Sequence, residues 1–171
     1  MMSVLYGPAM KHGYSDPHYR EIGGVKSKQR SKTMEDRMSL IVFSGTVDKL
    51  MAASILATGG AAMGLEVELF LTTWGLEAFR KGHYKTNRKV SKDFEEYGPV
   101  MMEQMMVKKV PSWMENLIGA KEVGDVKIYA CSMTMELFDM KLSDLEPIVD
   151  EVTGVATFVE RAKDGKITLF I

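Results

Sequence analysis

The sequence predicts an α/β fold in which helical layers lie on both sides of an open, mostly parallel sheet of four or five strands. Short apolar runs that end at glycine or polar residues alternate along the chain with longer segments of helical periodicity. The first strand–helix–strand unit has the spacing of a parallel crossover, which is right-handed in nearly all proteins. Alternation of this kind is typical of one sheet between two layers of helices.

The first predicted unit begins with a short apolar strand. Residues 39–45 read SLIVFSG, a run that is typical of a strand buried on both faces. Residues 46–64 predict a helix, and Thr46 or Asp48 can cap its start. Residues 65–75, LEVELFLTTWG, predict the second strand of the sheet.

An insert of unusual composition follows the second strand, from about residue 76 to residue 111. Its first part, residues 76–92, holds six basic residues and one acidic residue, a local net charge of +5. This stretch can act as a basic flap that attracts anions, or it can be a solvated face, and both interpretations stay open.

The second part of the insert is rich in methionine and predicts an amphipathic helix that Pro111 ends. Methionines repeat there at i, i+4 in two pairs, Met101 with Met105 and Met102 with Met106. Methionine suits both irregular gaps in a core and adaptable contact surfaces. The stripe is therefore either part of the core or a contact with a partner or a second subunit.

Two capping boxes mark the starts of further predicted helices. The sequence SWME at residues 112–115 has this spacing and predicts a short helix that closes near Gly119. The sequence SDLE at residues 143–146 repeats the spacing ahead of residues 147–154, PIVDEVTG, which we therefore expect to be helical.

The rest of the sheet is predicted from three segments near the C-terminal end of the sequence. Residues 125–134, DVKIYACSMT, predict another buried strand. Residues 154–165 predict a helix, because apolar residues fall at i, i+3, i+4 and i+7, namely Val155, Phe158, Val159 and Ala162. Residues 166–171, KITLFI, predict the last strand.

The segment before the sheet differs from the rest of the chain. In residues 1–37, scattered apolar residues are mixed with Gly, Pro, Ser and basic residues. We expect a partly flexible N-terminal arm there, followed by a single domain over residues 38–171. At 171 residues the chain is long enough for one sizeable core.

Composition excludes several classes of protein. The net charge of −1 gives no help with a phosphate backbone, so we expect no nucleic-acid partner. No apolar run reaches the length of a membrane span, and the first residues lack the apolar segment of a secretory signal. The one cysteine excludes a disulfide within the chain, so nothing favours an oxidising compartment, and we expect a cytoplasmic protein.

That cysteine, Cys131, is the candidate for chemistry. Ligands of parallel sheets bind outside the carboxyl ends of the strands, and Cys131 lies at such an end, directly before polar Ser132. A helix that begins near Thr134 would point free N–H groups at the sulfur and would favour a thiolate or a bound persulfide anion. From the residues alone, a structural role is equally acceptable, because free cysteine is often a small buried hydrophobe.

Other familiar sites are missing from the sequence. It contains neither the phosphate-binding G-x-x-x-x-G-K-[ST] nor a G-x-G-x-x-G after a strand. Three histidines and one cysteine make no zinc spacing, so we expect no metal, and a C-x-x-C oxidoreductase lacks its second cysteine. His83 can be a base for Cys131, but a surface histidine is the simpler interpretation.

Three segments resemble the DsrE/DsrF-like family, in the branch found among peroxiredoxin-like and sulfur-oxidation proteins. They read FSGTVDKLMAASILATGGAAMGLEVELFLTTWG, VKIYACSMTMELFDMKLSDL and GVATFVERAKDGKITLFI. The resemblance extends over about residues 38–171 and joins three strand ends in their order along the chain. It implies a three-layer α/β/α domain of the DsrEFH type, usually assembled into homo-oligomers.

The resemblance also implies a function. The family's cysteine, which matches Cys131, carries sulfur as a persulfide or thiosulfonate and exchanges it with small TusA-type carrier proteins. The positions that would surround the sulfur are Thr46, Asp48, Lys49, Trp74, Gly75 and the amides of Met133, Thr134 and Met135. Some members use a second cysteine, and because this chain has none, a relay between two cysteines of one subunit is excluded.

We therefore expect a cysteine-dependent sulfurtransferase or sulfur carrier that takes small anionic sulfur species and needs no metal or organic cofactor. Two alternatives remain. One is a non-enzymatic oligomeric interaction module with an inert cysteine. The other is a domain that binds a small ligand or nucleotide in the same strand-end crevice.

Overall fold

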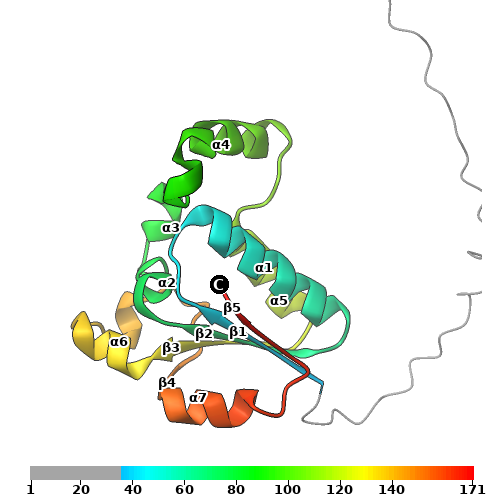
Figure 1. Cartoon of the computed structure of the whole chain (residues 1–171), viewed down its shortest axis with the longest axis vertical. Helices are drawn as coiled ribbons and strands as arrows, with labels where there is room; N and C mark the ends of the chain where they lie inside the picture. The colour runs from blue at the N-terminus through cyan, green and yellow to red at the C-terminus, as the bar shows by residue number, and fades with distance from the viewer. Residues whose placement is uncertain (1–35) are drawn as a thin grey trace, which may run out of the picture. The chain divides into compact units, whose positions relative to one another are not determined.

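The computed structural model of the chain describes residues 36–171 (Figure 1). The expected N-terminal arm, residues 1–37, lies outside the described residues apart from its last two positions. The first strand already begins at Arg37, whose side chain is buried. The sheet thus starts one residue before the expected domain boundary.

Five parallel strands form one sheet, which confirms the predicted fold class. Their order is β4-β3-β2-β1-β5, and each neighbouring pair is parallel. The strands are β1 (Arg37–Val42), β2 (Glu66–Leu71), β3 (Val126–Cys131), β4 (Glu151–Thr153) and β5 (Ile167–Phe170). The register aligns Val42 with Leu71 and Leu71 with Ala130, so β1, β2 and β3 end at the same edge of the sheet.

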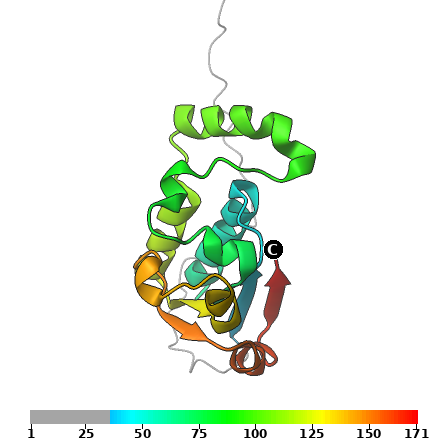
Figure 2. The same ribbon diagram turned by 90° about the vertical axis from the view of Figure 1, so that its left-hand side faces the viewer.

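Helices cover both faces of this sheet and give three layers. They are α1 (Val47–Ala62), α2 (Thr73–Glu77), α3 (His83–Thr86), η2 (Lys92–Tyr97), α4 (Gly98–Val107), α5 (Trp113–Val123), α6 (Ser132–Leu137), η3 (Leu142–Asp144) and α7 (Val155–Ala162). Figure 1 shows α1 and α5 on one face and α7 on the other. In Figures 1 and 2, α4 lies beyond the N-terminal end of α1.

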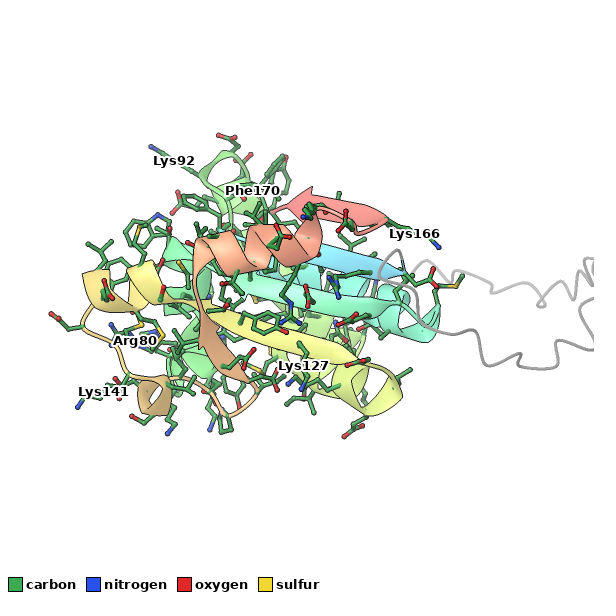
Figure 3. All side chains as sticks on the ribbon, turned by 90° about the horizontal axis from the view of Figure 1, so that it is seen from below. Arg80, Lys92, Lys127, Lys141, Lys166 and Phe170 are labelled. Atoms are coloured by element: carbon green, nitrogen blue, oxygen red, sulfur yellow. The ribbon has the colours of Figure 1, made fainter. Side chains whose placement is uncertain are left out.

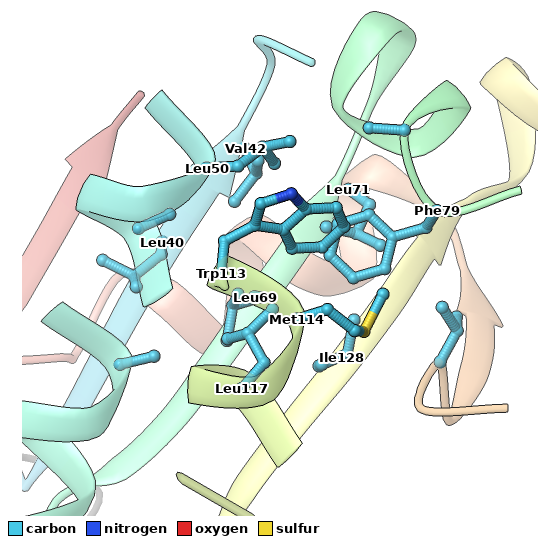
Figure 4. Packing of buried hydrophobic residues seen from close by; sticks show 14 of the residues in the cluster. Leu40, Val42, Leu50, Leu69, Leu71, Phe79, Trp113, Met114, Leu117 and Ile128 are labelled. Atoms are coloured by element: carbon cyan, nitrogen blue, oxygen red, sulfur yellow. The ribbon is translucent and has the colours of Figure 1, made fainter. Parts of the chain in front are cut away.

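The face covered by α1 and α5 holds the main hydrophobic core. Leu40, Leu69 and Ile128 form one register row across β1, β2 and β3, and all three are buried. Trp113 and Leu117 of α5 pack on this face of the sheet (Figure 4). Burial of each such side chain stabilises the fold by about 1.5–3 kcal/mol.

The face covered by α7 holds a smaller cluster. Its buried members are Phe70, Tyr129, Cys131, Phe158 and Ala162. The rings of Phe70 and Phe158 stack with their centroids 4.6 Å apart, which fixes α7 on the sheet. The candidate cysteine therefore belongs to this second cluster and not to the main core.

The helix predicted for residues 147–154 is wrong, because this segment contains β4. The Asp150 N–H donates to the Ile128 carbonyl at 2.9 Å, and the Asp150 carboxylate accepts from the Ile128 N–H at 2.7 Å. Pairing with β3 thus outweighs the local helical pattern. The expected capping box is absent as well, since the Glu146 carboxylate accepts from the Gly82 N–H at 2.6 Å.

The helix predicted from the other capping box is confirmed, but its predicted end is wrong. The Ser112 hydroxyl accepts from the Glu115 N–H, and the Glu115 carboxylate accepts from the Ser112 N–H at 2.7 Å. Helix α5 continues past Gly119 and ends before Gly124. A Cβ at Gly124 would lie 2.9 Å from the Cβ of Ala61, so a glycine is needed where α5 meets α1.

The methionine-rich helix is confirmed as α4, but it ends at Val107, before the expected Pro111. The structure also divides its methionine stripe. Met101, Met102 and Met105 are partly buried and pack against the main core. Met106 is 74% exposed. The core interpretation therefore holds for three of the four methionines, whereas Met106 faces solvent.

Candidate functional site

The carboxyl ends of β1, β2 and β3 bring three loops together at one edge of the sheet. The first loop leads into α1, the second into α2, and the third passes directly from β3 into α6. In parallel sheets this edge is where ligands bind, because side chains and helix starts converge there. The predicted site residues lie in these loops and in the helix starts that follow them.

Close backbone contact joins the first two loops. The Gly75 N–H donates to the Phe43 carbonyl at 2.7 Å, and a Cβ at Gly75 would lie 2.1 Å from the Val42 carbonyl oxygen. A Cβ at Gly45 would likewise lie 2.3 Å from the Trp74 carbonyl oxygen. Both glycines are needed for this approach, so the part that Gly75 plays here is to hold the two loops together.

Cys131 is the last residue of β3 and the N-cap of α6. It is 4% exposed, and its side chain lies on the α7 face among Phe70, Tyr129 and Phe158. It pairs in register with Thr153 of β4, two residues before α7 begins. The thiol thus lies at the expected end of the sheet but beneath α7, where solvent hardly reaches it.

The start of α6 determines which amides lie near Cys131. In a helix that begins at Ser132, the N–H groups of Ser132, Met133 and Thr134 have no acceptor in a preceding turn. The N–H of Met135 is the first that can donate within the helix, to the Cys131 carbonyl. Helix geometry therefore favours Met133 and Thr134 of the expected amides, while the Met135 side chain packs into the main core.

Threonine side chains connect the start of α6 to the second loop. The Thr134 hydroxyl lies 3.1 Å from the Thr72 hydroxyl and accepts from the Thr73 N–H at 3.1 Å. Thr73 itself has a φ of 49°, a backbone conformation that non-glycine residues rarely adopt. The Trp74 ring packs against Phe138 at the end of α6, with centroids 5.9 Å apart. The second loop and α6 therefore form one continuous unit.

The basic segment is fastened across the start of α1. The Asp48 carboxylate accepts from the Ser91 N–H at 3.1 Å and from the Ser91 hydroxyl at 2.5 Å. Burial opposes ionisation of Asp48, but hydrogen bonds from Ser91, Thr46 and the backbone outweigh it and hold the pKa of this carboxyl below its usual value. The Val47 N–H also donates to the Lys89 carbonyl at 2.7 Å. Asp48 therefore anchors the basic segment.

A cavity of about 440 Å³ opens between this segment and the first two loops. Its wall includes Thr46 and Trp74, two of the predicted site residues. The basic segment contributes His83, Arg88 and Lys89. The cationic side chains and the Thr46 hydroxyl can bind a small anion, although Glu77 also lines the cavity. Cys131 is not among the lining residues.

The structure thus divides the predicted residues into two groups. Thr46 and Trp74 line the cavity, whereas Cys131, Met133, Thr134 and Met135 lie at the start of α6. Trp74 connects the groups through Phe138. Lys49 is exposed on the first turn of α1 and lines neither this cavity nor the cluster around Cys131.

A buried ionic cluster lies on the same sheet face as Cys131. Glu68 is fully buried and pairs with Arg161 of α7 at 2.5 Å and with Arg37 at 3.6 Å. The Arg161 guanidinium also lies 4.9 Å from the ring centre of Tyr129. Burial, together with the Glu68 carboxylate, raises the pKa of Tyr129 to about 12. Tyr129, two residues before Cys131, therefore stays neutral at physiological pH.

Sequence reasoning missed several residues of this region. Thr72 carried a signal, because it is the first polar residue after a buried strand, in LTTWG. Phe158 was recognised as an apolar helix residue, but nothing in its spacing shows that it covers Cys131. Arg161 is 93 positions from Glu68, and no local pattern connects two such residues.

Two kinds of feature are not found among residues 36–171. No helix in this part of the chain is long and apolar enough to cross a membrane. No group of three or more His, Cys, Asp or Glu side chains in the same part of the chain could hold a metal ion.

Comparison with known proteins gives a family match over almost all of this domain. The model of the DsrE/DsrF/DrsH-like family matches residues 34–96 and 88–170. The two matched ranges meet in the segment between α3 and α4, which belongs to the basic, methionine-rich insert. The second range includes β3, Cys131 and α6.

Two curated proteins are similar over most of their length. An uncharacterized protein, YrkE of Bacillus subtilis, is 34% identical over 155 residues, which cover 79% of this chain and 96% of YrkE. A protein named sulfur carrier protein DsrE2, of Allochromatium vinosum, is 30% identical over 161 residues, which cover 80% of this chain and 99% of DsrE2. A solved structure of a protein of unknown function, MTH1491 of Methanobacterium thermoautotrophicum, is also similar. The match has a TM-score of 0.49 at 16% sequence identity, and it covers 79% of this chain and 98% of the MTH1491 chain.

Proposed function

Because this chain belongs to the DsrE/DsrF/DrsH-like family, we propose that it acts in sulfur metabolism, as a sulfur carrier or sulfurtransferase. In this proposal, Cys131 holds a sulfane sulfur or a thiosulfate group and exchanges it with a TusA-type carrier protein. The relative named as a sulfur carrier supports the role, since the alignment covers nearly its whole length. The proposed location is the cytoplasm, where a lone thiol stays reduced.

The observation that carries the proposal is the position of Cys131. It ends β3 at the carboxyl edge of the sheet and occupies the N-cap position of α6. The Cys131 side chain makes no hydrogen bond to the first amides of α6, and in this proposal those amides stabilise the longer, anionic sulfur adduct once it is formed.

Loading requires only thiolate chemistry. With tetrathionate, the Cys131 thiolate attacks one of the two inner sulfurs, a Cys–S–S–SO₃⁻ adduct forms, and thiosulfate leaves. With a persulfide donor R–S–SH, the thiolate attacks the outer sulfur, the Cys131 persulfide forms, and R–S⁻ leaves. Both steps balance without an oxidant, and the same exchange in reverse passes the sulfur to an acceptor thiol.

The burial of Cys131 requires the donor to gain access. The thiol is 4% exposed and belongs to the buried cluster that Phe158 of α7 closes against Phe70. In this proposal α7 moves slightly away from the sheet during transfer, a local opening of the kind found in weakly packed segments. The same cover protects a loaded persulfide from water and from unrelated thiols.

The basic segment supplies attraction for anions in this proposal. Arg88 and Lys89 line the cavity next to Trp74 and are exposed. They would gather small anionic sulfur species or the acidic face of a carrier protein near the carboxyl edge. Carrier binding should then weaken steeply as salt rises, and binding that does not change with salt would remove this part of the proposal.

The direct test is an intact-mass measurement. Purified protein is incubated with thiosulfate, with tetrathionate or with polysulfide, and its mass is recorded before and after treatment with a reductant. We expect a reductant-sensitive sulfur or thiosulfate adduct on the wild type and none on Cys131→Ser. An unmodified thiol with all three donors, in a protein whose circular dichroism is native, would reject the proposal.

One observation favours a second candidate, a small-anion binding domain with an inert cysteine. The cationic cavity does not include Cys131 among its lining residues. If this candidate is correct, saturable binding of an anion should be lost in Arg88→Gln and should be unchanged in Cys131→Ser. The adduct measurement separates the two candidates, because only the first requires covalent loading.

A further inference from the structure

The two edges of the sheet are protected to different degrees. β4 forms one edge, has only three residues and begins with Glu151 directly after Asp150. A short, charged strand of this kind resists pairing with another strand. β5 forms the other edge and follows Lys166, but it has neither a charged residue nor a proline between Ile167 and Phe170. β5 is therefore the edge that is open to pairing.

The hydrogen bonds of β5 show which of its backbone groups face outward. The Ile171 N–H donates to the Ile41 carbonyl at 2.9 Å, and the Ile171 carbonyl accepts from the Phe43 N–H at 2.8 Å. Backbone groups alternate in direction along a strand, so Leu169 also faces β1. The N–H and C=O groups of Thr168 and Phe170 therefore point away from the sheet. Among residues 36–171, no strand lies on that side of β5.

Apolar side chains accompany this open edge on both faces of the sheet. Phe170 is 68% exposed, on the α7 face, and its ring lies 5.7 Å from that of Phe43, which is 39% exposed (Figure 3). Leu169 lies on the opposite face and is partly exposed. An unpaired strand lined by exposed apolar side chains marks a surface that another strand covers.

We propose that β5 pairs antiparallel with β5 of a second copy of this chain, about a twofold axis at Leu169. The outward groups suit this arrangement, because Thr168 of one copy would then face Phe170 of the other. Each of these two pairs would exchange two backbone hydrogen bonds, and Leu169 would face its own counterpart. The edge is thus complementary to itself, as a twofold interface requires, and the two sheets would join into one of ten strands.

This inference gives a structural basis to the homo-oligomer that the sequence resemblance implies. It rests on the edge of the sheet and not on the chemistry of Cys131. The two proposals can therefore fail separately, because mass adducts test the cysteine and molecular size tests the edge.

The first test measures molecular mass in solution by sedimentation equilibrium of the full chain. We expect a concentration-dependent dimer, or a larger assembly built from dimers. Phe170→Lys should weaken it by at least about tenfold, since two exposed aromatic contacts are lost and charges enter the edge. The matched control is Val107→Lys on α4, because Val107 is 70% exposed but distant from the sheet. Equal weakening by both variants, or a wild type that remains monomeric, would overturn the proposal.

The second test determines the register. In a Cys131→Ser background, Leu169→Cys places one thiol per chain on the proposed axis, opposite its own counterpart. Mild oxidation should give a disulfide-linked dimer in high yield, because facing Cβ atoms of a non-hydrogen-bonded pair lie close enough to bridge. Thr168→Cys and Phe170→Cys in the same background should cross-link poorly, since neither faces itself. Equal cross-linking at all three positions would contradict the twofold axis at Leu169.

Discussion

The two faces of the sheet differ in what they bury. Beneath α1 and α5 the sheet presents only apolar side chains, with Leu40, Leu69 and Ile128 in one row. Beneath α7 it presents a fully buried carboxylate, Glu68, and the single cysteine, Cys131. Both faces come from the same strands, because neighbouring residues of a strand point to opposite sides.

The difference indicates a division of tasks. The α1–α5 face gains its stability from area removed from water, and no group on it is reactive. The α7 face depends on one short helix, which is fixed by an aromatic pair and an ionic cluster. A helix held by so few contacts can open locally while the other face keeps the fold intact. The proposed sulfur site lies on the face that can open.

Among substitutions on the two faces, the largest loss of stability is expected from Glu68→Gln on the α7 face. The substitution removes the buried charge that pairs with Arg161 and Arg37, and leaves two guanidinium groups without their shared partner. We expect the free energy of unfolding, measured in urea, to fall by about 3–5 kcal/mol. Glu160→Gln, which changes an exposed carboxylate on the same helix, is the control and should have no measurable effect. Equal stability of both variants would mean that the ionic cluster does not hold α7.

A somewhat smaller loss is expected from Leu69→Ala on the apolar face. The cavity left by this buried side chain should lower the free energy of unfolding by about 2–5 kcal/mol. Alkylation of Cys131 by iodoacetamide should remain as slow as in the wild type under native conditions, because α7 packs on the other face. Fast alkylation in this variant would show that Cys131 becomes accessible only by global unfolding.

Phe158→Leu should have a modest effect on stability and a clear effect on access. Loss of the aromatic pair with Phe70 should lower the free energy of unfolding by about 0.5–1.5 kcal/mol. Because local opening of α7 becomes easier by a similar amount, alkylation of Cys131 should accelerate about three- to tenfold. An unchanged alkylation rate would mean that α7 does not control access to the thiol.

The smallest effect is expected at Asp48, which lies outside both faces. Its pKa is lower in the folded protein than in the unfolded chain, so its hydrogen bonds stabilise the fold above about pH 4, and this contribution disappears as the pH falls through the folded pKa. Asp48→Asn should lower the free energy of unfolding at pH 7 by about 1 kcal/mol. The two proteins should become equally stable near pH 2, and a difference that persists there would exclude the charge as its cause.

Much of the fold could be predicted from the sequence, because most elements carry a local signal. The spacing of Val155, Phe158 and Ala162 predicts α7, and the capping box at Ser112 predicts the start of α5. β4 could not be predicted, since three residues are too few for periodicity. Its identity depends on hydrogen bonds to β3, which a reading of local sequence cannot detect.

The site was predictable only in part, for a related reason. The rule that ligands bind at strand ends correctly placed Cys131 next to a helix start and Trp74 in a cavity wall. Which face Cys131 occupies depends on the register of β3 against its neighbours, and the covering residue, Phe158, comes from a distant helix. The separation of the cavity from Cys131 is likewise a result of packing.

The position of β5 in the sheet also affects how the protein is made. β1 is the first described strand and β5 is the last described element, yet the two are hydrogen-bonded neighbours. During synthesis, one side of β1 therefore stays open until nearly the whole described chain has left the ribosome. Leu40 and Ile41 lie along that open side, so the nascent chain presents an apolar, unpaired strand for most of its translation. Ribosome-associated chaperones should therefore associate with the nascent chain until β5 emerges and the sheet is complete.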